Sequence, residues 1–237
     1  MTVMIVGASR GLGRALLDGL AQQGHEVIGV ARTPRTHETA ANSDIRWIRA
    51  DLADPRKAAR VIAEQTPASL ETVIYNVGIW ERTAFTDAYR FIDQDEGEIE
   101  SMIATNITGA LLVLRRLLPI LLDNAQPRVI LTGSTSGLSR SGRPEAAFGA
   151  SKFALNGIAD ALREGHRNER LAVTTLQLGY LNTEDSLDSP LEHASRRSDG
   201  QLVPVHDIVR LMQTILALSP SSFLREVTLA AIRDERF

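Results

Sequence analysis

The sequence predicts a single-domain α/β protein built on a doubly wound parallel β-sheet, and three observations lead to this prediction. Short runs rich in Val, Ile and Leu recur along the 237 residues, and helix-like stretches separate most of them. These runs carry apolar residues at successive positions, as strands buried on both faces do. Strands that alternate with helices indicate a parallel sheet with helices on both faces. No repeat or low-complexity linker divides the chain, so we expect one domain over residues 1–237.

The predicted elements follow one another in a regular order. The expected strands are Val3–Val6, Val27–Ala31, Ile45–Ala50, Thr72–Asn76, Arg128–Thr132, Ala172–Leu178 and Glu226–Ala230. The expected helices are Leu12–Gln23, Arg56–Gln65, Glu98–Leu122, Glu145–Arg167 and His206–Leu218. The helices at 98–122 and 145–167 are apolar on more than one face, so each buries more than one side. Core packing alone explains this pattern as well as a homodimer or homotetramer does, and we predict the oligomer.

The composition excludes several classes of function. With 26 Lys and Arg against 29 Asp and Glu, the net charge of −3 argues against nucleic-acid binding. The chain has no cysteine, and its five histidines are scattered, so we expect no metal site and no thiol chemistry. The N-terminus does not resemble a signal peptide, and no uncharged apolar run reaches the roughly 18 residues of a membrane span. We therefore expect a soluble, cytoplasmic protein without membrane partners.

A glycine-rich turn follows the first predicted strand and opens the first predicted helix. Its sequence is Gly7-Ala8-Ser9-Arg10-Gly11-Leu12-Gly13. Glycines in such a turn let the backbone approach a pyrophosphate closely, and the helix N-terminus offers N–H groups to the anion. A purely structural turn is the alternative, but the strand–turn–helix context favours a dinucleotide site.

The end of the second strand indicates which dinucleotide binds. NAD sites usually place an acidic residue here, but this chain has Arg32, which suits a 2′-phosphate. Arg10 and the Ser9 hydroxyl lie in the turn and could bind the same phosphate. The sequence therefore predicts NADP(H) as the cofactor.

These motifs resemble those of the short-chain dehydrogenases/reductases, a family with the Rossmann fold. The Gly-x-x-x-Gly-x-Gly spacing is similar, although Val6 stands where threonine is common. The further similar segments are Asp51-Leu52, Tyr75-Asn76-Val77-Gly78, Leu178-Gly179-Tyr180-Leu181-Asn182-Thr183 and Val203-Pro204-Val205-His206-Asp207-Ile208. The chain departs from the family pattern at Tyr75, Val77 and Leu178.

The resemblance also implies roles for these segments around the cofactor. Asp51 and Leu52 would contact the adenine, and Asn76, Val77 and Gly78 would line the cofactor. Gly179, Leu181 and Thr183 would lie beside the nicotinamide.

The family uses an Asn, a Ser, a Tyr and a Lys in catalysis, and the chain matches three of them. Asn106 matches the asparagine that holds a water, and Ser134 matches the serine that hydrogen-bonds the substrate oxygen. Lys152 matches the lysine that binds the nicotinamide ribose and lowers the pKa of the tyrosine. Phe148, four residues earlier and on the same helix face, stands at the tyrosine position. Losing such a general acid typically costs about 10²- to 10⁴-fold in rate.

Several interpretations of Phe148 remain open. The chain is a divergent enzyme that is weak or uses another donor, an enzyme whose tyrosine was replaced by engineering, or a catalytically silent NADP(H) sensor. Tyr180 is the alternative phenol, although simple packing against cofactor or substrate also explains it. A non-redox lyase or isomerase on the same fold is a further alternative.

Our prediction is an NADP(H)-dependent oxidoreductase acting on a small carbonyl or alcohol substrate. We expect a substrate lid around residues 181–200, whose polar side chains indicate a solvated loop more simply than a charged substrate. Trp80 could form an apolar wall of the same cleft.

Overall fold

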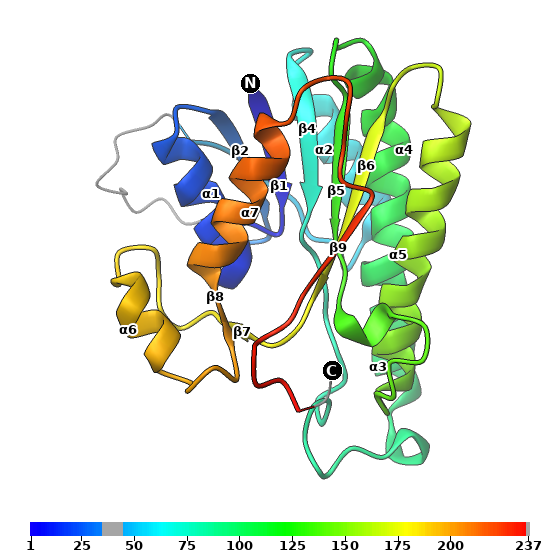
Figure 1. Cartoon of the computed structure of the whole chain (residues 1–237). Helices are drawn as coiled ribbons and strands as arrows, with labels where there is room; N and C mark the ends of the chain where they lie inside the picture. The colour runs from blue at the N-terminus through cyan, green and yellow to red at the C-terminus, as the bar shows by residue number, and fades with distance from the viewer. Residues whose placement is uncertain (35–44, 236–237) are drawn as a thin grey trace.

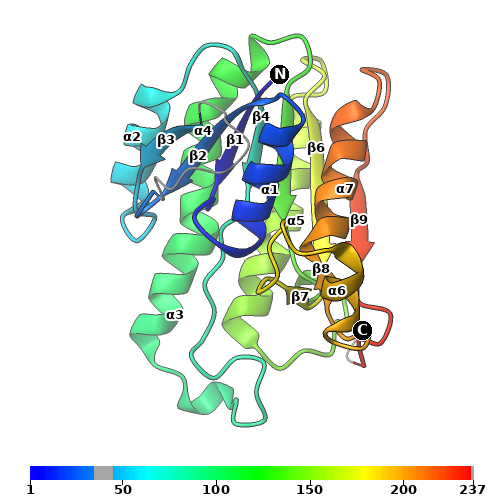
Figure 2. The same cartoon turned by 90° about the vertical axis from the view of Figure 1, so that its left-hand side faces the viewer.

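Seven parallel strands form the central sheet of the computed structural model, which describes residues 1–34 and 45–235. The strand order is β3-β2-β1-β4-β5-β6-β9 (Figures 1 and 2). The chain starts at β1 in the middle, winds outwards through β2 and β3, and then returns to β4 on the other side of β1. The strand order therefore reverses between β1 and β4. Open α/β sheets bind their ligands at such a reversal, beyond the carboxyl ends of the strands, so a ligand site is expected beyond the ends of β1 and β4.

The strands of this sheet are β1 Thr2–Val6, β2 Glu26–Ala31, β3 Arg46–Arg49, β4 Leu70–Tyr75, β5 Arg128–Thr132, β6 Ala172–Leu178 and β9 Glu226–Leu229. The longer helices are α1 Gly11–Gln22, α2 Pro55–Gln65, α3 Glu96–Ile103, α4 Gly109–Leu122, α5 Ala146–Gly165 and α7 Val205–Ala217. The shorter elements are the 3₁₀ turns η1 Phe91–Asp93 and η3 Thr135–Gly137, the π-helical turn η2 Ala104–Thr108, the strands β7 Leu181–Asn182 and β8 Val203–Pro204, and helix α6 Leu191–Arg196.

Helices cover both faces of the sheet and enclose two hydrophobic cores. The helices α1 and α7 pack together on one face (Figures 1 and 2). The helices α2, α4 and α5 cover the other face, where they bury residues such as Ile62, Leu117 and Leu155. The strands contribute apolar side chains to both cores, which explains why their sequences are apolar at successive positions.

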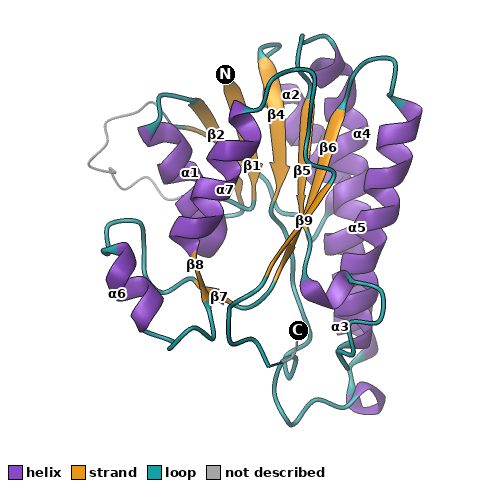
Figure 3. Cartoon of the chain, in the orientation of Figure 1, coloured by secondary structure: helices purple, strands orange, loops and turns teal. Residues whose placement is uncertain are grey.

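The segment that the sequence predicts as a lid lies beyond the carboxyl ends of the strands. It consists of α6 and the β7–β8 pair, as Figure 3 shows. Its polar side chains mainly bind one another, because Asn182 Nδ2 donates to Asp185 Oδ2 over 2.8 Å and Arg197 Nη1 pairs with Asp185 Oδ1 at 3.1 Å. The lid at 181–200 thus contains a helix and a strand that the sequence did not predict.

The predicted fold class is confirmed: a single-domain parallel sheet with helices on both faces, in which all seven expected strands occur within about two residues of their predicted bounds. Residues 35–44 and 236–237 of the predicted domain lie outside the described residues. The segment Glu96–Leu122 is long and apolar enough to cross a membrane. In this fold it is a core helix, since its apolar face packs against the sheet and α2.

Candidate active site

The glycine-rich turn lies between the ends of β1 and β2, where Gly7 N donates to Val30 O over 2.9 Å. A Cβ atom at position 13 would lie 1.9 Å from Gly7 O, so only glycine lets α1 begin this close to the turn. Among the described residues, no side chain caps the N-terminus of α1, and its first turn carries no acidic residue. Its N–H groups are therefore available to an anion, as a bound pyrophosphate requires.

The two predicted phosphate-binding arginines lie at the same edge of the sheet. Arg10 is the N-cap residue of α1, and Arg32 directly follows β2, which pairs with β1. Both side chains are exposed, and Ser9, which precedes Arg10 in the turn, is half-buried. An exposed pair of guanidinium groups fits the dianionic 2′-phosphate of NADP(H).

The residues predicted to contact the adenine and to line the cofactor follow β3 and β4 at this edge. Asp51 is exposed and accepts a hydrogen bond from Ala53 N at 3.0 Å, while Leu52 is buried beneath it. Asn76 Nδ2 donates to Gly7 O over 3.3 Å. The segment after β4 is thereby attached to the glycine-rich turn.

The loop after β6 closes the cofactor side of the site. Thr183 lies 3.5 Å from the place of a Cβ at Gly11, so the loop reaches back to the turn. Gly179 N donates to Leu229 O over 2.9 Å, and Leu181 belongs to β7. These residues come together at one edge of the sheet.

Lys152 lies buried between the ends of β4 and β5. Its Nζ donates to Thr132 O over 2.9 Å and to Val77 O over 3.2 Å. A Cβ at Gly78 would lie 2.9 Å from this Nζ, so the glycine makes room for the ammonium. Burial lowers the pKa of Lys152 from 10.5 to about 8, because removal from water disfavours the charged form.

Asn106 lies in the π-helical turn η2, which joins α3 to α4. Its side chain accepts from Ile79 N at 2.9 Å and donates to Ile79 O at 2.8 Å and to Ser151 Oγ at 2.9 Å. The amide therefore links the loop after β4 to the helix that carries Lys152. π-helical turns are frequent at functional sites, but the helical sequence pattern did not reveal this one.

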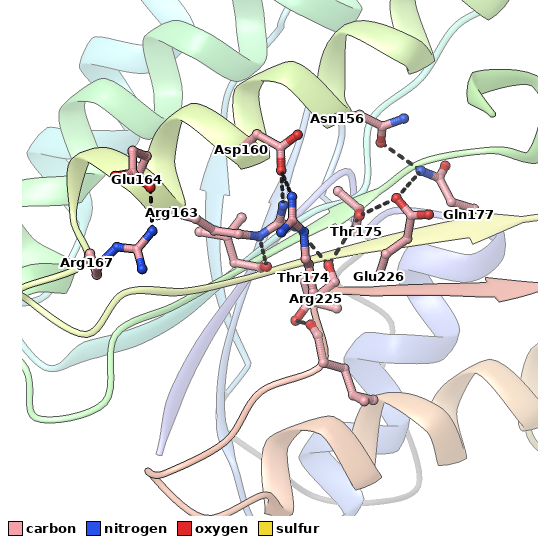
Figure 4. A network of polar contacts seen from close by, with 12 residues as sticks. Asn156, Asp160, Arg163, Glu164, Arg167, Thr174, Thr175, Gln177, Arg225 and Glu226 are labelled. Carbon is pink, nitrogen blue, oxygen red and sulfur yellow. Dashed lines mark hydrogen bonds and ion pairs between the residues drawn. The ribbon is translucent and has the colours of Figure 1, made fainter. Parts of the chain in front are cut away.

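Ser134 directly follows β5, and a polar network supports it from behind. Its Oγ accepts a hydrogen bond from Ser136 N at 3.1 Å. Its backbone N donates to Gln177 Oε1 over 3.2 Å. Gln177 Nε2 in turn donates to Asn156 Oδ1 and Glu226 Oε2, which links α5, β6 and β9 (Figure 4).

Phe148 has the surroundings of a packed side chain and is 5 % exposed. Its ring centroid lies 5.2 Å from that of Phe85 and 6.3 Å from that of Trp80, both edge to face. The ring of Phe85 also contacts Tyr180, with centroids 5.8 Å apart. Lys152 Nζ lies 5.8 Å from the centroid of Phe148.

The start of α5 is held by acidic residues that the sequence did not single out. Glu81 is buried, and its Oε1 accepts from Phe148 N at 3.2 Å and from Tyr89 Oη at 3.4 Å. Tyr89 Oη accepts from Ala146 N at 2.9 Å. Glu145, also buried, accepts from Phe85 N at 2.9 Å, which helps to hold Phe85 at its left-handed φ of 65°.

Arg143 is another residue that sequence reasoning missed. Its side chain is 4 % exposed and pairs with Asp234 at 3.5 Å. Its Nη1 donates to Tyr180 Oη over 2.9 Å, and its guanidinium carbon lies 4.8 Å from the centre of the Tyr180 ring. No local pattern around position 143 pointed to this buried guanidinium.

This arrangement defines a class: a doubly wound dinucleotide-binding fold with a buried lysine, a serine and an asparagine at the strand ends. The family model "short chain dehydrogenase" matches residues 1–190, and the chain belongs to the short-chain dehydrogenase family. An NADPH-dependent pterin aldehyde reductase of Arabidopsis thaliana is 32 % identical over 199 residues, or 77 % of this chain and 76 % of that protein. The uncharacterised oxidoreductase YbbO of Escherichia coli K12 is 28 % identical over 227 residues, or 92 % and 82 % of the two chains.

Solved structures share the fold over almost the whole chain. Serine dehydrogenase from Escherichia coli superposes with a TM-score of 0.79 at 18 % identity, covering 98 % of each chain. An alcohol dehydrogenase from Thermococcus sibiricus, complexed with 5-hydroxy-NADP, gives 0.78 at 18 % identity and covers 98 % of this chain and 96 % of the other. The family and the composition of the turn together identify the cofactor as a nicotinamide nucleotide.

Proposed function

We propose that the protein is an NADP(H)-dependent oxidoreductase that interconverts a small carbonyl compound and its alcohol. The observation that carries this proposal is the convergence of Lys152, Ser134 and Asn106 at the strand ends beside an uncapped helix N-terminus. In this proposal Lys152 binds the ribose of the nicotinamide, and Ser134 donates its hydroxyl hydrogen to the substrate oxygen. Asn106 fixes the loop after β4 relative to α5. The bound nicotinamide supplies the hydride.

The preference for NADP(H) rests on Arg32 and Arg10. Replacing Arg32 by Asp should weaken NADPH binding by about 10²-fold or more, because it exchanges a cation for an anion beside the 2′-phosphate, while NADH binding changes little. Titration of nicotinamide fluorescence measures both affinities. Arg167→Asp is the control, since Arg167 follows the far end of α5. Equal losses for NADPH and NADH would remove the case for a 2′-phosphate site.

Turnover is tested by restoring the phenol. Phe148→Tyr should raise the single-turnover rate of aldehyde reduction by about 10²-fold or more, because it returns a general acid next to Lys152. Rapid mixing with NADPH and a panel of aldehydes measures the rate. Failure of the native chain to bind NADPH would overturn the proposal.

A silent NADP(H) sensor is the second candidate, and the packed environment of Phe148 supports it. Tight NADPH binding without turnover in either the native chain or Phe148→Tyr would favour this candidate. The non-redox alternative would be favoured by a protein that binds NADPH and turns over a lyase or isomerase substrate. Such a protein would show no hydride transfer, and Phe148→Tyr would not change this.

We further propose that the protein forms a homodimer through α4 and α5. A groove of about 830 Å³ runs between these helices and is lined by apolar residues such as Leu112, Ile158 and Leu162. Exposed Leu111 and Phe153 extend this apolar surface. Arg115, Asp123 and Glu169 also border the groove, so a copy related by a two-fold axis could bring opposite charges together.

A further inference from the structure

The proposed reaction lacks a proton donor at position 148, and the three tyrosines of the chain differ in what their hydroxyl groups do. Tyr75 Oη donates to Thr105 O over 3.2 Å and is fully buried, so its proton is committed to the core. Tyr89 Oη donates to Glu81 Oε1 over 3.4 Å. Tyr180 Oη instead accepts, from Arg143 Nη1 at 2.9 Å. Within the described residues, the Tyr180 proton is therefore the one that no protein acceptor takes.

Tyr180 also lies on the substrate side of the site. It follows β6, the strand next to β5, whose end carries Ser134. Its ring contacts Phe85, and Phe85 contacts Phe148. The other terminal nitrogen of Arg143, Nη2, lies 3.5 Å from Thr135 Oγ1, which is adjacent to Ser134 in the chain. Phe85 thus connects the Tyr180 ring with Phe148, and Arg143 connects the Tyr180 hydroxyl with Thr135, the neighbour of Ser134.

Lys152 and Ser134 are less suited to deliver the proton. Lys152 directs two of its three N–H bonds to the carbonyls of Thr132 and Val77. A serine hydroxyl is a much weaker acid than a phenol, and the proposed role of Ser134 is to hold the substrate oxygen. Tyr180 combines an acidic hydroxyl with a cation that stays beside its oxygen.

We propose that Tyr180 replaces the missing phenol as the proton donor, and that Arg143 positions it. This inference rests on the proposed function. As the carbonyl carbon is reduced, the electron pair of the C=O bond moves to the substrate oxygen, which takes the proton from Tyr180 as the Oη–H bond breaks. The phenolate left behind is stabilised by Arg143 Nη1–H and regains its proton from water.

Asp234 keeps Arg143 in place for this role. The ion pair between them is almost fully buried, at 3.5 Å. Gly179 allows this approach, since a Cβ there would lie 3.1 Å from Asp234 Oδ2. The backbone of Tyr180 is held as well, because Val203 N donates to Tyr180 O over 2.8 Å. A fixed ring and a fixed guanidinium are what a preorganised donor requires.

The test compares Tyr180→Phe in two backgrounds, because a donor and a packing residue behave differently there. In the native background, Tyr180→Phe should lower the single-turnover rate of aldehyde reduction by about 10- to 100-fold, as loss of a general acid does. In the Phe148→Tyr background the same change should cost less than about threefold, since the restored phenol makes Tyr180 dispensable. Arg143→Met should lower the single-turnover rate as much as Tyr180→Phe does in each background. Arg143→Lys keeps a cation beside Tyr180 and should retain most of the rate.

A binding measurement without cofactor provides a second readout. Benzamide presents a carbonyl oxygen but accepts no hydride, so Tyr180→Phe should weaken its binding about fivefold through the loss of one hydrogen bond. Quenching of Trp80 fluorescence in a Trp47→Phe background measures this affinity, because these are the two tryptophans of the chain.

The outcomes separate this inference from the proposed function. An equal cost of Tyr180→Phe in both backgrounds, or no cost in the native one, would overturn the donor role while leaving the reductase intact. Unchanged benzamide affinity would also contradict it. Loss of NADPH binding or turnover in every protein would instead mean that the proposed function fails.

Discussion

At the scale of single residues, Lys152 shows what the site costs the fold. The side chain is 5 % exposed, and its two carbonyl partners carry no charge. Burial therefore lowers its pKa to about 8, whereas the unfolded chain leaves it near its ordinary value of about 10.4. A lysine kept in such a place without a carboxylate is better explained by the cofactor than by stability.

This cost predicts a pH dependence of stability. Between pH 8 and about 10.4 the unfolded chain binds more protons at Lys152 than the folded chain does, so the free energy of unfolding rises with pH. The gain should be about 3 kcal/mol across this window, and Lys152→Met should lack it. Urea unfolding of the native chain and of Lys152→Met at intervals from pH 7 to pH 10 measures the difference between their free energies of unfolding. The titration of Tyr75 and Tyr89 cancels in this difference, because both proteins contain these tyrosines. Parallel curves would contradict the lowered pKa of Lys152.

At the scale of elements, the sequence predicts well what one segment determines by itself. The strands are recognisable because both of their faces are buried, and Phe148 and Lys152 share a face of α5 because they are four residues apart. The lid helix α6 escaped prediction because Ala194 is its one buried residue, which leaves it no apolar stripe. The π-helical turn η2 escaped because one extra residue in a turn hardly alters an apolar pattern.

Partners from distant elements could not be predicted in the same way. Glu81 caps α5 across 67 positions of sequence, and Gln177 supports Ser134 across 43. Arg143 donates a hydrogen bond to Tyr180, which lies 37 positions further along the chain. It also forms an ion pair with Asp234, which belongs to the segment after β9. These contacts depend on the packing of elements that no local pattern encodes, so the sequence alone offers candidates for the reacting groups but not the residues that hold them.

At the scale of the whole molecule, the outer surface of α4 and α5 is the feature that the monomer leaves unexplained. Leu111 is 48 % exposed beside a groove that is apolar along most of its length. Exposed apolar surface of this kind usually marks an interface. Phe148 and Lys152 lie on the same helix α5 as this surface, so a dimer would also rigidify the helix that carries them.

The oligomeric state can be tested with one charge on that surface. Leu111→Glu should turn a dimer into a monomer at micromolar concentration, because burying the carboxylate in the apolar groove costs desolvation that pairing with Arg115, one turn away on α4, offsets only in part. Sedimentation velocity measures the state, and Ile92→Glu is the matched control, since Ile92 is 81 % exposed in η1, away from the groove. Circular dichroism should show that both variants stay folded. A native chain that sediments as a monomer would contradict the dimer, and so would a Leu111→Glu protein that remains dimeric. A variant that becomes monomeric and also loses NADPH affinity would indicate that the second copy helps to hold α5 in its binding position.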